Sequence, residues 1–339
     1  MLVVVALFTA FLTATAHLST ERNRRIVCAN NLRQIGMGAL MYARSQGISG
    51  TYWSHVESFP RTRYDESNPT PTAYTGADSN LSFSDDNYVP PSSSAPYLAP
   101  RANDVSASLF LIFRTQMIRP DPFVCPGSDG EPYHGGPYEH ANFPSRQYLG
   151  YSYSNPFPTA AALKVGWRFD DNVAADSPLA ADMNPGFGAT KVSPKSSPSE
   201  MSAGNSINHD GTGQNVLYID GHTEFQTTPF CGRQRPDGYR DNIYTFGDSS
   251  SRPAMGIEGP PQDAYDAVLL PTMDDGPQPP KRPWTQKLDG TDLLTFAGEG
   301  VAALVAIVMA IRVLIARRRR RTSRLRTLPR VTPLPPALP

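Results

Sequence analysis

The order of apolar and polar residues predicts one long helix at the start of the chain. Residues 1–18 are apolar and uncharged apart from His17. From residue 21 onward, apolar side chains recur at steps of four and three positions, at Cys28, Leu32, Ile35, Ala39 and Tyr42. This spacing places them on one face of an α-helix. Together the two stretches predict a helix over residues 1–47, about 65–70 Å long at 1.5 Å per residue, with an apolar first half and an amphipathic second half.

Two glycines, Gly36 and Gly38, lie inside the amphipathic half of this helix. Each costs about 1 kcal/mol relative to alanine in a helix interior. Close approach of a neighbouring helix or strand would explain them, and tolerated irregularity is the alternative. We favour close packing.

The clearest local pattern further along predicts a β-hairpin. Residues 216–219 form a short β-favouring run, Asp220-Gly221 follows at once, and residues 222–225 return as the second strand. The Asp-Gly dipeptide favours a type I′ turn, in which both central residues have positive φ.

A second apolar stretch covers residues 293–316, and five arginines, Arg317–Arg321, follow it directly. This pattern is typical of a transmembrane helix with its C-terminal tail, residues 317–339, in the cytoplasm. A core helix with a nucleic-acid-binding tail is the alternative. For residues 1–18, a signal peptide, a membrane anchor and a buried helix remain open.

The composition indicates a body rich in loops. The 339 residues include 34 Pro and 26 Gly, well above average usage. We predict an α+β body over residues 48–249 and a Pro/Gly-rich linker over residues 250–292. Eight of the 31 basic residues follow Ala316, which leaves 23 basic against 31 acidic residues in the rest of the chain. A basic patch is therefore missing from the body, and we predict no nucleic-acid partner.

Three cysteines, Cys28, Cys125 and Cys231, allow at most one intramolecular disulfide. Cys125 and Cys231 lie in loop-like contexts next to Pro and Gly, so we take them as the possible pair. A CxxC pair is absent, which argues against a structural zinc site of the usual spacing.

Four short motifs carry a family resemblance. Cys28-Ala29-Asn30-Asn31-Leu32-Arg33-Gln34-Ile35-Gly36 resembles the C-x-N-N-L-K-Q-I-G stretch of bacterial prepilin-type proteins, often labelled type II secretion protein G-like pseudopilins, which also carry an H-X9-DG domain. The H-X9-DG domain is the second hallmark of this family. The stretch that contains His209, Asn215, Asp220, Gly221 and His222 resembles it. Phe123-Val124-Cys125-Pro126 and Asp241-Asn242-Ile243-Tyr244 resemble two further motifs.

The chain departs from this family at three points. Ten residues rather than nine separate His209 from Asp220. The sequence starts Met1-Leu2-Val3, where the family has a basic leader and a Gly-Phe-Thr-Leu-Ile-Glu motif. A C-terminal transmembrane helix is also unlike a pilin, which has one span.

His209, Asp210, Asp220, His222 and Glu224 lie within sixteen residues, which raises the question of a metal site. We favour a structural role, because the turn already explains Asp220. If a metal binds, the resemblance implies calcium, with Asp210 and Asp220 as the candidates. A Cys–His hydrolase built on His209 lacks a recognisable third, orienting group, so we predict no catalytic residues and no enzyme.

The sequence thus predicts an α+β fold: a pilin-like long N-terminal helix packed on an antiparallel β-sheet, loop-rich, plus a C-terminal transmembrane helix. The resemblance implies a non-enzymatic, membrane-anchored pseudopilin-like envelope protein without a cofactor, associated with assembly or secretion. Its partners would be the lipid bilayer and either pseudopilins, secretion-system proteins or copies of itself. It would lie in the bacterial inner membrane with its body on the non-cytoplasmic side. A membrane-anchored module that binds calcium or a glycan on a pilin-like scaffold is the alternative.

Overall fold

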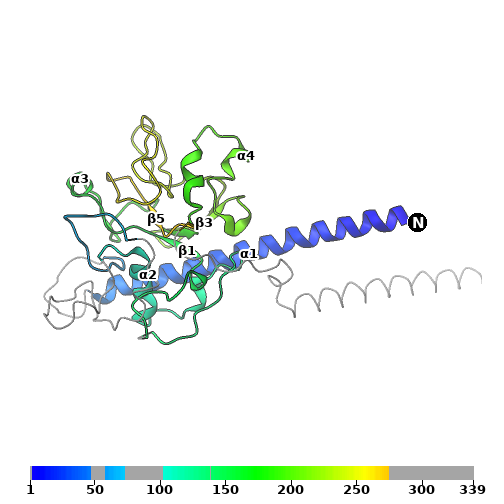
Figure 1. Cartoon of the computed structure of the whole chain (residues 1–339), viewed down its shortest axis with the longest axis horizontal. Helices are drawn as coiled ribbons and strands as arrows, with labels where there is room; N and C mark the ends of the chain where they lie inside the picture. The colour runs from blue at the N-terminus through cyan, green and yellow to red at the C-terminus, as the bar shows by residue number, and fades with distance from the viewer. Residues whose placement is uncertain (1, 47–57, 73–101, 138, 275–339) are drawn as a thin grey trace, which may run out of the picture. The chain divides into compact units, whose positions relative to one another are not determined.

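A computed structural model of the chain describes residues 2–46, 58–72, 102–137 and 139–274 (Figure 1). All of them belong to one compact unit, Met1–Lys281. An α-helix and an antiparallel sheet form its centre, as the α+β prediction expects.

Helix α1 covers Leu2–Gln46, 45 residues in all, and confirms the predicted long helix. The face predicted from the spacing of four and three is fully buried, from Cys28 through Leu32, Ile35 and Ala39 to Tyr42. In Figure 1, the second half of α1 lies against the sheet and the loops around it, whereas the first half projects beyond them.

The sheet has five antiparallel strands in the order β4-β3-β2-β1-β5. The strands are β1 (Tyr151–Ser154), β2 (Pro178–Asp182), β3 (Gln214–Tyr218), β4 (Thr223–Gln226) and β5 (Leu269–Leu270). The predicted hairpin is β3–β4, with Val216 opposite Glu224. Helix α1 packs against β3 at the centre of this arrangement.

Both faces of the sheet are covered, which explains why β1, β2, β3 and β5 are buried throughout. Successive side chains of a strand point to opposite faces. Accordingly, Leu217 belongs to the core shared with α1, whereas Val216 and Tyr218 belong to a second core. That second core is completed by Ile243, Tyr244 and other residues of the loops after β4.

The hairpin turn differs from the predicted type I′. The amide of Gly221 donates to the carbonyl of Tyr218 at 2.9 Å, and Gly221 has a φ of +88°. Asp220, however, is not among the residues with positive φ. The loop is therefore one residue longer than predicted, Ile219–Gly221, and has the pattern of a type I turn followed by a left-handed glycine.

Short helices connect these elements. They are α2 (Val105–Arg114), η2 (Asp121–Phe123), η3 (Arg146–Tyr148), α3 (Ala160–Lys164), η4 (Gly186–Lys191), α4 (Pro198–Met201) and η5 (Ile207–His209). The longest, α2, starts at Asp104, whose side chain accepts a hydrogen bond from the amide of Ala107. Every residue of α2 is buried, next to α1.

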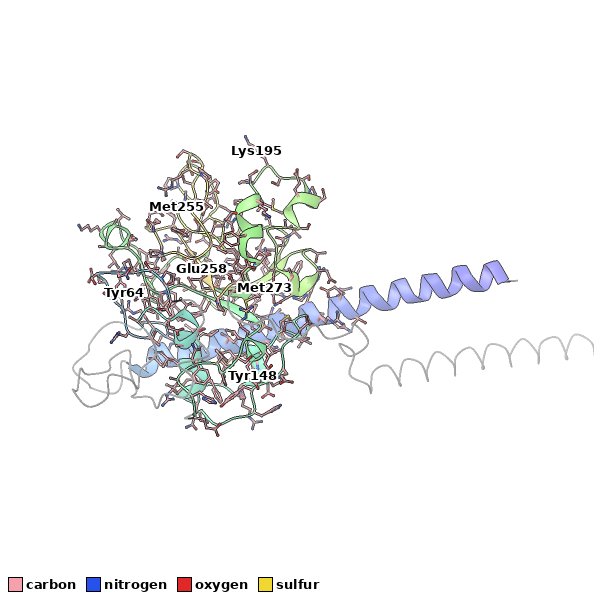
Figure 2. All side chains as sticks on the ribbon, in the orientation of Figure 1. Tyr64, Tyr148, Lys195, Met255, Glu258 and Met273 are labelled. Carbon is pink, nitrogen blue, oxygen red and sulfur yellow. A yellow bond between two sulfur atoms is a disulfide. The ribbon has the colours of Figure 1, made fainter. Side chains whose placement is uncertain are left out.

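The predicted linker over residues 250–292 is wrong for its described part. Residues 250–274 belong to the body, because β5 pairs with β1 and both Val268 and Leu269 are fully buried. In Figure 2, Glu258 and Met273 mark this segment against the sheet, and Met273 packs on the core. The Pro and Gly residues here serve tight turns. Residues 275–292 lie outside the described residues.

The predicted fold class also requires a correction, because it included a transmembrane helix. In the part of the chain that the structure describes, no helix is long and apolar enough to cross a membrane. From Glu21 onward, α1 is an amphipathic helix packed on a sheet. The predicted span at residues 293–316 and the tail at residues 317–339 lie outside the described ranges.

Helix α1 approaches its neighbours closely at the two glycines, as favoured from the sequence. A Cβ atom on Gly38 would lie 2.5 Å from Cγ2 of Ile112 and 2.9 Å from Cγ2 of Ile118. A Cβ atom on Gly36 would meet only the ends of the Leu217 side chain, the nearest at 2.9 Å. Isoleucine is stiff at χ1, so its Cγ2 methyl yields less readily than the end of a leucine.

We therefore expect Gly38→Ala to destabilise the protein by about 1–2 kcal/mol, even though alanine is the better helix former. Gly36→Ala should cost less, because Leu217 can rotate away. Chemical denaturation measures both effects. Met37→Ala is the matched control, since Met37 is 62% exposed on the same helix. A Gly38→Ala variant more stable than the wild type would contradict the close packing.

Candidate functional site

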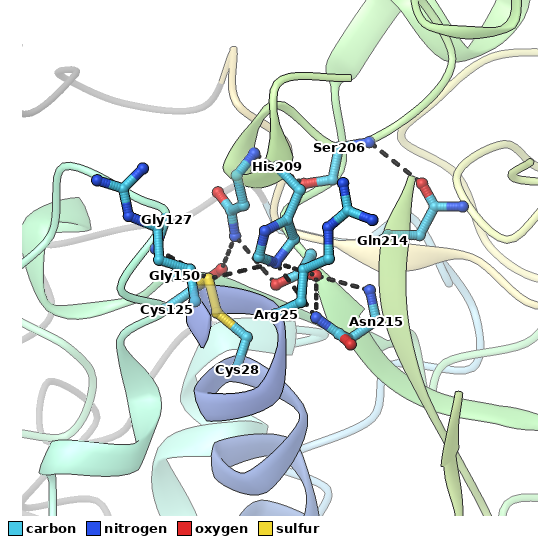
Figure 3. A network of polar contacts seen from close by, with 12 residues as sticks. Arg25, Cys28, Cys125, Gly127, Gly150, Ser206, His209, Gln214 and Asn215 are labelled. Carbon is cyan, nitrogen blue, oxygen red and sulfur yellow. Dashed lines mark hydrogen bonds and ion pairs between the residues drawn. A yellow bond between two sulfur atoms is a disulfide. The ribbon is translucent and has the colours of Figure 1, made fainter. Parts of the chain in front are cut away.

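His209 lies at the centre of a buried polar network where α1 meets the sheet (Figure 3). It ends η5, where Ser206 caps the turn by accepting from the amide of Asn208. Its Nδ1 lies 2.9 Å from Oε1 of Glu21, on α1, and its Nε2 lies 3.1 Å from Oδ2 of Asp182, at the end of β2. The imidazole thus connects the long helix to the sheet.

The two carboxylates determine the charge of this histidine. Burial alone would lower the pKa of His209, but the hydrogen bonds to Asp182 and Glu21 outweigh it and raise the pKa to about 9. Burial likewise opposes the charge of Glu21, yet the bonds from His209 and Arg25 lower its pKa. At neutral pH an imidazolium therefore donates one N–H to each carboxylate.

A disulfide between Cys28 and Cys125 lies directly beside this histidine. The Cys125 sulfur is 3.8 Å from Nε2 of His209 and also accepts from the amide of Gly127 at 3.3 Å. Both cysteines are fully buried. The bond attaches the middle of α1 covalently to the segment that follows η2.

The predicted Cys125–Cys231 pair is therefore wrong. Cys28 lies on the buried face of α1, and Asn31, one turn further along, donates to the carbonyl of Val124 at 2.9 Å. This contact holds the segment with Cys125 against the helix. Cys231 is a free, buried thiol in the second core, and burial raises its pKa to about 12.

Asp182 is the main residue that the sequence analysis missed. It is fully buried and accepts from the backbone amide of Asn215 at 2.7 Å and from the Asn215 side chain at 3.1 Å. The side chain of Asn208 reaches its other oxygen at 3.3 Å. The available signal was an acid at the end of the apolar run Pro178-Leu179-Ala180-Ala181, where a buried carboxylate needs partners.

The structure brings all four motifs together around this network. Cys28 and Asn31 come from the motif at residues 28–36, Cys125 from the motif at residues 123–126, and His209 and Asn215 from the H-X9-DG-like motif. The fourth contributes Tyr244, whose hydroxyl donates to the backbone carbonyl of Asp182 at 2.7 Å. The segment after Cys125 also packs closely against η5, since a Cβ on Gly127 would lie 2.0 Å from the carbonyl oxygen of Asn208.

The other motif residues lie elsewhere. Leu32 and Gly36 pack α1 on the sheet, whereas Asn30 and Gln34 face solvent. Asp220, Gly221 and His222 form the exposed hairpin tip. There Asp220 accepts from the amide of His222 at 3.0 Å, and the His222 ring stacks on Tyr218 with centroids 4.4 Å apart.

Asp210 and Asp220, the candidate calcium ligands, have separate local roles. Asp210 ends η5 in a left-handed conformation with a φ of 55°, and Asp220 fastens the hairpin turn. Among the described residues, neither belongs to a group of three or more side chains that could hold a metal.

A Cys–His hydrolase built on His209 lacked a recognisable orienting group in the sequence, and the network supplies a candidate for that group. Asp182 takes that position, because it bonds the histidine that lies beside Cys125. The sulfur of Cys125 is bonded to Cys28, however, and cannot act as a nucleophile in this state. Chemically, the arrangement is a covalent cross-link next to a buried ion triad, which consists of Glu21, His209 and Asp182.

Comparisons of the chain with protein-family models, curated proteins and solved structures found no match. The resemblance to pseudopilin-like proteins therefore stays a prediction from the four motifs.

Proposed function

We propose that this protein is a non-enzymatic, pseudopilin-like assembly subunit in which the first half of α1 binds the same helix of further copies. The length of α1 carries the proposal. Its 45 residues correspond to about 68 Å. Among the residues of α1 whose side chains the structure describes, 20–44, the buried face runs from Cys28 to Ala43, about 24 Å.

The composition of the first half supports association through this segment. Residues 2–16 contain neither a charged side chain nor a histidine, and most of them are apolar. A helix that is apolar all round requires an apolar environment on every side. Neighbouring copies of α1 supply such an environment when helices pack side by side.

The attachment of α1 to the body fits the same role. The disulfide at Cys28 and the ion triad through Glu21 hold the helix where it leaves the sheet. Arg25 adds a hydrogen bond to Thr212 at 2.8 Å and lies over the Phe225 ring at 4.1 Å. A subunit that assembles through one half of a helix needs the other half fixed to its body, and these contacts meet that need.

The proposal is tested by placing charges in the apolar half of α1 in the full chain. Leu7→Glu combined with Phe11→Glu puts two acids one turn apart on one helix face. We expect self-association, measured by sedimentation and chemical cross-linking, to weaken at least about tenfold, which corresponds to about 1.4 kcal/mol. The melting transition of the body should stay unchanged.

Phe187→Glu is the matched control, because Phe187 is 65% exposed on the body. It introduces the same kind of charge at an apolar position far along the chain from α1 and should leave association intact. A double variant that associates as strongly as the wild type would count against α1 as the assembly element.

A further inference from the structure

Four side chains of the kinds that bind transition metals converge around the disulfide (Figure 3). They are Cys28, Cys125, Asp182 and His209, and one ligand atom of each lies within 4.8 Å of those of the others. All four residues are completely buried. They come from α1, from the segment after η2, from the end of β2 and from the end of η5. The set therefore contains no CxxC pair, and sequence spacing could not reveal it.

The two cysteines are thiols in every newly synthesised chain, because a disulfide forms only when an oxidant removes two electrons. In that reduced state both sulfurs can act as ligands. Thiolate sulfur and imidazole nitrogen favour zinc over calcium and magnesium, which take oxygen ligands. Two sulfurs, one nitrogen and one carboxylate oxygen make up the four ligands of a closed, tetrahedral zinc site.

The positions of the ligand atoms fit such a site. With Zn–S bonds of about 2.3 Å and bonds to nitrogen and oxygen of about 2.0–2.2 Å, a tetrahedral ion holds sulfur about 3.6 Å from nitrogen and nitrogen about 3.4 Å from oxygen. In the structure, Sγ of Cys125 lies 3.8 Å from Nε2 of His209, and Nε2 lies 3.1 Å from Oδ2 of Asp182.

The sulfurs are the atoms that have to move. In a tetrahedral site they lie about 3.8 Å from each other, so the S–S bond must be absent. The Cα atoms of Cys28 and Cys125 are 5.1 Å apart. Rotation of the side chains about their Cα–Cβ bonds separates the sulfurs while the helix and the segment after η2 keep their places.

The residues around the histidine and the aspartate orient both as ligands. Glu21 lies 2.9 Å from Nδ1 of His209, which leaves Nε2 to face the sulfur and Asp182. A metal-bound histidine almost always gives its second ring N–H to an acceptor of this kind. Asn215 donates to Asp182 Oδ2 from its backbone amide at 2.7 Å and from its side chain at 3.1 Å. Both ligands are thus held before a metal binds.

We propose that the reduced chain binds one Zn²⁺ through Cys28, Cys125, Asp182 and His209. The ion takes the place of the Nε2 proton of His209 and of the two thiol protons, so three protons leave for each ion bound. Its two positive charges balance the two thiolates, and no atom changes its oxidation state. A disulfide and a zinc ion exclude each other here, because both use the same two sulfurs.

The ion would give the reduced chain a link at the position of the later disulfide. It would join α1 to the segment after η2, as the bond does, and would also hold the ends of β2 and η5 through Asp182 and His209. Oxidation of the two sulfurs would release the ion. The site is separate from the apolar half of α1, so this proposal and the assembly proposal succeed or fail separately.

Titration of the full chain with Zn²⁺ after reduction by a phosphine tests this site. The phosphine takes an oxygen atom from water and becomes the phosphine oxide, and the disulfide becomes two thiols. We expect calorimetry to give one Zn²⁺ per reduced chain, with binding to the oxidised chain at least a hundredfold weaker. At a hundredfold excess over the dissociation constant, the melting temperature of the reduced chain should rise by about 5 °C or more. Reduced protein that binds no Zn²⁺ saturably would overturn the proposal, and so would equal binding by the oxidised protein.

Co²⁺ in place of Zn²⁺ reports the ligands directly. We expect the reduced chain to give the visible absorption of a four-coordinate cobalt ion, together with a sulfur-to-cobalt charge-transfer band in the near ultraviolet. Both features should be missing from the oxidised chain. A six-coordinate spectrum without the sulfur band would rule out the site.

His209→Gln is the diagnostic variant, because it removes the nitrogen ligand and leaves both cysteines in place. We expect it to lower the Zn²⁺ affinity of the reduced chain at least about a hundredfold, since even the loss of a residue that only orients a ligand costs about 10–100-fold. His222→Gln, at the exposed hairpin tip, and Cys231→Ala, at the free thiol, are the matched controls and should bind as the wild type does. Equal affinity of His209→Gln and the wild type would refute the assignment. Should that variant fail to fold, the cobalt spectrum of the wild type still decides.

Discussion

Replacing both Cys28 and Cys125 by alanine is expected to lower the free energy of unfolding by about 4–5 kcal/mol. The disulfide closes a loop with a sequence separation of 97 residues, and a cross-link over such a loop removes much conformational entropy from the unfolded chain. The loss of two buried sulfurs from the core acts in the same direction. Urea denaturation of the oxidised wild type and of the double variant measures the difference.

Cys231→Ala provides the matched control for the loss of a buried sulfur. Cys231 is as buried as the bonded cysteines but free, so its replacement removes packing without removing a cross-link. We expect Cys231→Ala to lower the free energy of unfolding by about 1–2 kcal/mol. The Cys28–Cys125 disulfide should stay intact in this variant. A double variant no less stable than Cys231→Ala would contradict a stabilising role of the bond.

The stability of the protein should fall by roughly 3 kcal/mol between pH 6.5 and pH 9.5 through His209 alone. The hydrogen bonds to Asp182 and Glu21 raise the pKa of His209 to about 9 in the folded state, against about 6.5 in the unfolded chain. A raised folded-state pKa contributes stability that is complete below the unfolded pKa. That stability is lost as the pH rises through the folded pKa.

Thermal or chemical unfolding across this pH range measures the effect, and two histidine variants isolate it. His209→Gln should remove most of the pH dependence, because glutamine does not titrate. His222→Gln should retain it, since His222 lies exposed at the hairpin tip. If the wild type and His209→Gln lost equal stability between pH 6.5 and 9.5, the charged histidine would be the wrong explanation.

The elements predicted best from the sequence depend on local repetition. The steps of four and three from Cys28 to Tyr42 fix the buried face of α1, because neighbours on a helix face are set by spacing alone. The strand run before Asp220-Gly221 likewise fixes the hairpin. The turn type was wrong, because a type I turn plus a left-handed glycine and a type I′ turn both accept Asp-Gly.

The site was less predictable, because its contacts join residues far apart in the chain. Cys28 was assigned to the core face of a helix and Cys125 to a loop, and spacing says nothing about which loop a helix meets. Asp182 carries no motif, and only its burial against His209 reveals its role. The segment after residue 250 was taken as a linker from its Pro and Gly content, although its short apolar run forms β5.

The Cys28–Cys125 bond also changes the covalent connectivity of the molecule. Residues 28–125 form a closed ring, and both α2 and the second half of α1 belong to it. A single break of the backbone anywhere inside this ring leaves every residue in one covalently joined molecule. The apolar half of α1 therefore stays attached to the sheet after such a cut, and only a reductant would release it.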